Sequence, residues 1–335
     1  MLYIYPSVNL QTSFRYSSYC SELWYNRGRK RGVLMYMTVR QAAELWGISD
    51  RRVRSLCSQG KITGAVQEGR LWRIPLDARK PADGRYKKVD SLLPLIDEKM
   101  MQLSKLRPLT DGELERLNEE FAVEYTYNSN AIEGNTLTLR ETDLVLRGLT
   151  IDQKPLKDHM EAIGHQEAFQ YVQRLVEENQ PLSEQMIKDI HYLVLADKKN
   201  DRGIYRRVPV RIMGAANEPA QPYMIAPLME KLLVDYAASQ ENMVTKLAQF
   251  HIAFESIHPF IDGNGRTGRL LVNLELMKVG YLPIDIKFTD RLAYYQAFDD
   301  FHSKGSLSAM EDLFAKYINE RLDMYLEILS LDDEG

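Results

Sequence analysis

The feature that most constrains this 335-residue chain is a glycine-rich stretch at 258–269, with the sequence HPFIDGNGRTGR. It lies between two segments with helical periodicity, 242–257 and 266–279. A loop with two glycines at a helix N-terminus leaves backbone N–H groups unpaired, and the helix dipole favours negative charge there. The stretch therefore predicts an anion-binding site between two helices.

The side chains of this stretch add metal and proton chemistry to the anion site. Arg266 and Arg269 are three residues apart and so lie on neighbouring turns, where they can hold more than one phosphate. Asp262 offers the hard oxygen ligand that Mg²⁺ on phosphates prefers. His258 can take a proton near neutral pH. Together these residues predict a site for the phosphates of a nucleotide.

Three other kinds of site fit the same residues less well. The spacing of Gly263, Gly265 and Gly268 matches a dinucleotide fingerprint, but that fingerprint follows a strand and the residues before this loop are helical. A P-loop needs Lys-Ser/Thr after its last glycine, and the sequence has none there. His251 and His258 are seven residues apart, which is not the i, i+4 spacing of paired metal ligands.

The stretch resembles the signature of the Fic family, His-x-Phe-x-Asp/Glu-Gly-Asn-Gly-Arg-x-x-Arg, with every specified position matched. The resemblance implies a mainly α fold, an all-helical Fic core over 91–335 with a β-hairpin flap. It also implies a protein adenylyltransferase that uses Mg²⁺ to transfer AMP from ATP to a Ser, Thr or Tyr hydroxyl. The acceptor would belong to a protein target or to the chain itself.

The resemblance also assigns roles to individual residues of this sequence. His258 would be the base that deprotonates the hydroxyl, and Asp262 would hold the metal. The nucleotide-binding residues would be Gly263, Asn264, Gly265, Arg266, Arg269, Tyr294 and Tyr295. The two tyrosines would flank the adenine, with core packing as an equal alternative. Strands at Arg207–Met213 and Gln221–Ile225 would form the flap that aligns the target.

A second match lies upstream, at Ser129, Glu133 and Gly134, and resembles the inhibitory motif of the same family. Glu133 would pair with Arg269 and take the place of the terminal phosphate, so the enzyme would be auto-inhibited. A capped helix end is the structural alternative. Glu133 could instead position a water that removes AMP from a modified target, and the sequence does not separate these two directions.

Residues 37–78 have the outline of a winged helix-turn-helix domain and resemble the MerR/excisionase type. The expected elements are a helix capped by Thr38, a helix Asp50–Ser58 capped by Ser49, and strands Ile62–Val66 and Leu71–Ile74. The arginines expected to contact DNA are Arg51, Arg52, Arg54, Arg70 and Arg73. Two alternatives stay open: a protein-binding module, and a DNA-binding regulator whose Fic domain senses a nucleotide.

Charge divides the chain in the same way. Residues 1–88 carry a net charge of +11 and the remainder −15, which indicates two units with different partners. Residues 79–90 are expected to be a linker, and residues 1–36 an extension of uncertain origin. The two cysteines favour a reducing cytoplasm, and no apolar run approaches the ~20 residues that span a bilayer. Homodimerisation stays open.

Overall fold

The computed structural model describes residues 36–46, 48–62, 64–69, 71–76, 78, 89–212 and 218–330. The chain divides into two compact units, Met1–Asp83 and Gly84–Gly335. Most of the expected extension at 1–36 and of the expected linker at 79–90 lies outside the described residues.

The first unit contains two short helices and a small antiparallel sheet. Its elements are β1 (Tyr36–Met37), α2 (Val39–Trp46), α3 (Asp50–Ser58), β2 (Val66–Glu68) and β3 (Leu71–Pro75), with strand order β1-β3-β2. Ser49 caps α3 as predicted, because its side chain accepts a hydrogen bond from the Arg52 amide. The predicted strand Ile62–Val66 is wrong: Gly64 turns the chain at φ +75°, and the strand begins only at Val66.

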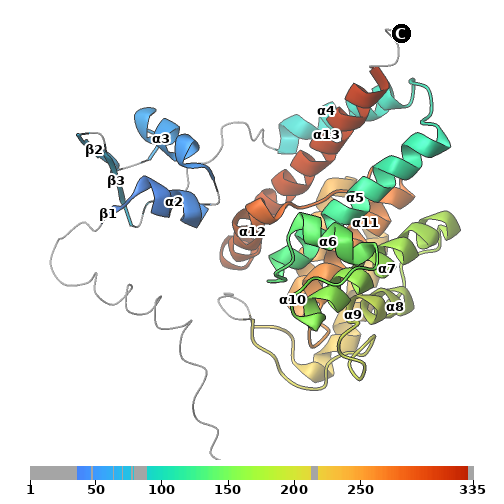
Figure 1. The fold of residues 1–335 in the computed structure, drawn as a ribbon. Helices are drawn as coiled ribbons and strands as arrows, with labels where there is room; N and C mark the ends of the chain where they lie inside the picture. The colour runs from blue at the N-terminus through green and yellow to red at the C-terminus, as the bar shows by residue number, and fades with distance from the viewer. Residues whose placement is uncertain are drawn as a thin grey trace, which may run out of the picture. The chain divides into compact units, whose positions relative to one another are not determined.

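The second unit is helical, as predicted, and two of its helices lie close to the predicted ranges 242–257 and 266–279. The elements are α4 (Val89–Leu103), α5 (Asp111–Ile132), α6 (Leu139–Leu146), α7 (Leu156–Glu178), α8 (Glu184–Val194), η1 (Pro222–Met224), α9 (Ile225–Ala238), α10 (Met243–Ile257), α11 (Asn264–Lys278), η2 (Phe288–Asp290), α12 (Arg291–Lys304) and α13 (Ser308–Ser330). In Figure 1, α4 lies along α13, and α11 lies among α5, α7 and α10.

Helix α11 is buried on all sides because it separates two apolar cores. Leu270 and Leu274 pack into a core shared with α5, α7, α8 and α9, while Val272 and Leu276 pack into a core shared with α4 and α13. Every residue of α11 from Arg266 to Leu276 is buried, the polar ones included. The N-terminus of α11, and with it the glycine-rich loop, is therefore held in a fixed position.

The predicted β-hairpin flap is wrong for the residues that the structure describes there. No strand forms over 207–212 or 218–225, and the latter range contains η1 and the start of α9. Pro209, Pro219 and Pro222 lack the N–H groups that a ladder needs. The buried guanidinium of Arg206 instead donates to the carbonyls of Val208 and Ala220, one on each limb of the loop.

Candidate nucleotide site

The glycine-rich loop is closed by its own side chains. Helix α10 ends at His258, which has a left-handed backbone with φ 51°. The amide of Asn264 spans the loop: its Oδ1 accepts from the Phe260 N–H at 2.9 Å, and its Nδ2 donates to the Phe260 carbonyl at 3.0 Å. Asn264 is buried, so its side chain fixes the loop that the Gly263 and Gly265 backbone completes.

His191 is a site residue that no local sequence pattern predicted. Its ring stacks on Phe260 with centroids 3.6 Å apart. Its Nδ1 accepts from the Gly203 N–H at 2.9 Å, so its Nε2 carries the proton and donates to the Asp262 carbonyl at 3.0 Å. Burial lowers the pKa of His191 to about 4, so the ring stays neutral and joins α8 to the loop.

The expected base, His258, lies in an environment that keeps it uncharged. Burial, and then the positive charge of Arg206, lower its pKa to about 4. Its Nδ1 faces the carboxyl of Glu255 at 3.8 Å, too far for a hydrogen bond. A neutral imidazole at pH 7 can accept a proton, which is what the predicted role requires.

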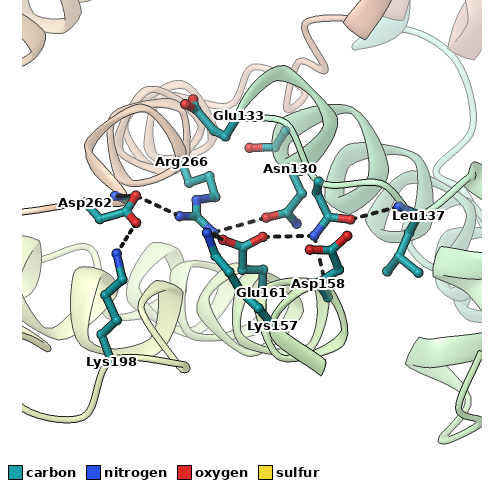
Figure 2. A network of polar contacts seen from close by, with 12 residues as sticks. Asn130, Glu133, Leu137, Lys157, Asp158, Glu161, Lys198, Asp262 and Arg266 are labelled. Atoms are coloured by element: carbon teal, nitrogen blue, oxygen red, sulfur yellow. Dashed lines mark hydrogen bonds and ion pairs between the residues drawn. The ribbon is translucent and has the colours of Figure 1, made fainter. Parts of the chain in front are cut away.

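Arg266 is enclosed by polar groups from two helices and from the glycine-rich loop (Figure 2). Its side chain is 1% exposed and lies 3.1 Å from Glu161 of α7, 3.4 Å from Asn130 of α5 and 3.3 Å from Asp262. Lys198 contacts the second oxygen of Asp262 at 2.5 Å. Burial alone would raise the pKa of Asp262, but Lys198 and Arg266 lower it to about 2, so the carboxylate is ionised.

Arg269 joins the inhibitory motif to the glycine-rich loop. Its guanidinium donates to the Ser129 hydroxyl at 3.1 Å, to the Ser129 carbonyl at 2.7 Å and to Glu133 Oε1 at 2.9 Å. A Cβ atom added at Gly265 would lie only 2.2 Å from Glu133 Oε1. The Glu133 carboxylate therefore lies directly on the N-terminus of α11, where the sequence predicts an anion.

Gly134 and the two tyrosines surround the end of α5. Gly134 has φ 94°, so the chain can turn immediately after Glu133. Tyr294 is buried, and its hydroxyl contacts His251 at 2.7 Å and Arg269 at 3.3 Å. Tyr295 is 43% exposed and donates to the Ile132 carbonyl at 2.9 Å. Both thus contact the site from α12, and their role beside the adenine stays a prediction.

Glu255 and Glu161 were also missed by sequence reasoning. The Glu255 side chain is 13% exposed, and burial and the charge of Glu133 raise its pKa to about 8. Its Oε1 has no hydrogen-bond partner among the described residues. Its one sequence signal is a carboxyl between the apolar Phe254 and Ile257. Glu161 gave no such signal, because its partner Arg266 is distant in the sequence.

The oxygen ligands near Asp262 suit a Mg²⁺ ion that is bound to phosphates. In the described part of the chain they do not form a metal site made of protein ligands alone. Within the ranges that the structure describes, no group of three or more His, Cys, Asp or Glu side chains could hold a metal. Asp262 is ionised and 31% exposed, and Glu161 is already paired with Arg266. A single carboxylate fits Mg²⁺, which usually keeps several waters and takes its other ligands from phosphate oxygens.

Comparison with known proteins identifies both units. The model of the Fic/DOC family matches residues 181–276, the segment that runs from α8 through α11. The chain carries a Fic/DOC domain. The model of a helix-turn-helix domain matches residues 36–78. The Fic domain thus contains His258, Asp262 and both arginines, while Ser129 and Glu133 lie N-terminal to the matched segment.

Relatives and solved structures agree with the family match. The chain is 33% identical to a protein adenylyltransferase Fic of Drosophila grimshawi, over 69% of this chain and 48% of that protein. It is 31% identical to one of Nematostella vectensis, over 75% and 61%. The chain thus spans about half to three fifths of these relatives. A Fic domain containing signaling protein from Bacteroides thetaiotaomicron has a TM-score of 0.61 and 28% identity, covering 72% of this chain and 94% of that one.

The predicted DNA contacts lie on the first unit. Arg51 and Arg54 are exposed on α3, and Arg54 is 3.8 Å from Asp50. Arg73 of β3 pairs with Glu68 of β2 at 3.1 Å, and Arg70 lies outside the described residues. Among the described helices of both units, none combines the length and apolar character needed to cross a bilayer.

Proposed function

We propose that this chain is an auto-inhibited, Mg²⁺-dependent protein adenylyltransferase that transfers AMP from ATP to a Ser, Thr or Tyr hydroxyl. One observation carries the proposal. The Glu133 carboxylate lies on the N-terminus of α11 and pairs with Arg269 at 2.9 Å, with the neutral His258 at the other end of the same loop. A site that stabilises a carboxylate in this way can stabilise a phosphate.

The proposed reaction uses His258 as the proton acceptor. Its Nδ1 is enclosed, so Nε2 is the atom that takes the proton of the acceptor hydroxyl. The hydroxyl oxygen bonds to the α-phosphorus as the bond to the bridging oxygen of the leaving pyrophosphate breaks. The free N–H groups at the start of α11 stabilise the negative charge that develops. Mg²⁺, held by Asp262, would neutralise charge on the phosphates.

Inhibition follows from the position of Glu133. Its carboxylate occupies Arg269 and would repel the terminal phosphate of ATP. ATP would then bind with its α-phosphate displaced, and a displacement near 1 Å can cost about 10²-fold in rate. The Glu133 side chain is 33% exposed, so water can solvate its carboxylate when it leaves, while Arg269 keeps its hydrogen bonds to Ser129.

Label transfer from α-phosphate-labelled ATP in cell lysate tests the proposal. Glu133→Gly should label protein more strongly than wild type, and Glu133→Gly/His258→Ala should not label at all. His302→Ala, at a histidine whose ring contacts Ser256 on α10, is the matched control and should label normally. Transfer that persists without His258 would overturn its role as the base. Release of AMP from a modified target by wild type would instead indicate hydrolytic removal of AMP, with Glu133 positioning the water.

We also propose that the first unit binds DNA. The match to a helix-turn-helix domain over 36–78 and the exposed arginines Arg51 and Arg54 on α3 support this. Binding through phosphates weakens as salt increases, because counterions are released. Arg51→Ala/Arg52→Ala/Arg54→Ala should abolish a salt-dependent DNA shift. An unchanged shift would indicate that the unit uses another surface or another partner.

A further inference from the structure

The two oxygens of Asp262 have different partners. Oδ1 accepts from the Gly263 N–H at 2.7 Å and from Arg266 at 3.3 Å. Oδ2 is held by Lys198 at 2.5 Å, its one partner within the described ranges (Figure 2). Oδ1 is thus fixed by groups of the loop and of α11, whereas Oδ2 is held by a side chain from the segment that follows α8.

The cations near Asp262 also differ in whether they can leave. Arg266 is 1% exposed and holds Glu161 as well, so its departure would leave buried charges unpaired. Lys198 is 37% exposed, and its ammonium can turn into water at little cost. A turn in which the Asp201 N–H donates to the Lys198 carbonyl at 3.0 Å keeps its backbone beside the loop. Lys198 is therefore the exchangeable partner of Asp262.

We propose that Lys198 lowers the affinity of this site for Mg²⁺, because its ammonium occupies Asp262 Oδ2 and competes with Mg²⁺ for that oxygen. The inference rests on the proposed function. Two ligand positions are then occupied in the resting site: Lys198 takes the position of the metal cation, and Glu133 takes that of the terminal phosphate anion. The two restraints lie on different segments, so removing one leaves the other in place.

Metal titration on the full-length chain tests this competition, with ADP as the probe. The readout is the rise in melting temperature caused by ADP, measured against Mg²⁺ concentration. Lys198→Met should reach its half-maximal rise at about three- to fivefold less Mg²⁺ than wild type, the effect of losing one partly exposed ion pair. Lys199→Met changes the neighbouring exposed lysine and should match wild type. Lys198→Arg keeps a cation, so its half-maximal rise should need at least as much Mg²⁺ as that of wild type.

Other outcomes separate this inference from the proposed function. A Lys198→Met half-point equal to or above that of wild type overturns the competition. Weaker ADP binding by Lys198→Met in EDTA, with a raised half-point, would mean that Lys198 holds phosphate instead. A third outcome is that ADP raises the melting temperature of neither wild type nor Glu133→Gly at any Mg²⁺ concentration tested. That result would overturn the proposed nucleotide site itself. Mn²⁺ binding without nucleotide, followed by electron paramagnetic resonance, should be tighter in Lys198→Met.

Discussion

The two arginines of α11 lie three residues apart, yet they are held by different regions of the Fic domain. Arg266 is enclosed by Glu161 of α7 and Asn130 of α5, and both helices pack against α11. Arg269 is nearly as buried, but its carboxylate partner Glu133 lies at the end of α5 and is 33% exposed. The same residue type on one helix face thus has one permanent and one removable counter-ion.

The difference indicates how one short motif can combine rigidity with regulation. The Arg266 end keeps the loop and Asp262 in place, because its charges satisfy one another inside the protein. The Arg269 end exposes a carboxylate at the position where a phosphate would bind. A change at the first end should therefore alter folding, and a change at the second should alter activity.

The largest expected effect is the loss of Arg266. Arg266→Met should lower the free energy of unfolding by about 3 kcal/mol, because Glu161 is 7% exposed and would keep only the half-exposed Lys157 as a counter-ion. Urea denaturation measures the change. Adding Glu161→Gln should restore part of the loss. Arg269→Met should lower the free energy of unfolding by less, because water can solvate Glu133. Equal losses for the two arginine variants would remove the distinction between the two ends.

The next effect concerns activity at the Arg269 end. Glu133→Gly should raise label transfer by about 10²-fold, because the terminal phosphate no longer competes with a carboxylate for Arg269. Glu133→Gln keeps the shape but not the charge and should give a smaller rise. Glu161→Gln is the matched control at the other end and should give no rise. Activation by Glu161→Gln would mean that both arginines are regulated.

A smaller effect is expected at Glu255, the buried acid beside Arg269. Its pKa rises from 4.5 to about 8 in the folded protein, so folded Glu255 retains a proton that the unfolded chain releases. Stability is therefore lost as the pH rises from 4.5 to 8. Glu255→Gln cannot ionise, and its melting temperature should exceed that of wild type by about 3 °C or more at pH 8.5 but not at pH 4.5.

Glu119→Gln, at an exposed position of α5, is the control for this pH dependence. It should show the same difference from wild type at both pH values. A Glu255→Gln difference that does not grow with pH would mean that Glu255 is already ionised in the folded protein at low pH. The Arg269 end would then contain no uncompensated acid, and the comparison with Arg266 would need revision.

Local sequence signals were enough to predict the helices and the pairing of Glu133 with Arg269. Apolar periodicity gave α10 and α11, and the resemblance to two motifs gave the inhibitory contact. The flap was mispredicted because Val, Ile and Arg over 207–212 suit a strand, whereas three prolines and the bonds of Arg206 decide the conformation.

Contacts between distant segments could not be predicted. Lys198 lies in a loop without periodic pattern, and its contact with Asp262 depends on how α8 packs against α11. Glu161 resembles any other charged residue of α7 until that helix is placed beside Arg266. The stacking of His191 on Phe260 likewise follows from tertiary packing. The sequence thus indicates the chemistry of the loop, and the fold supplies its counter-ions.

The smallest expected effect separates the buried from the exposed partner of Glu161. Lys157 contacts Glu161 at 3.4 Å and is 52% exposed, so solvent and salt screen the pair. Lys157→Met should change the free energy of unfolding by about 0.5 kcal/mol or less in urea denaturation, and less still in 1 M salt. A loss as large as that of Arg266→Met would mean that the exposed lysine holds Glu161 in place. The small loss expected here would show that the buried Arg266, and not Lys157, holds Glu161 in place. The charge of Arg266 can then remain inside the domain whether or not Glu133 leaves Arg269.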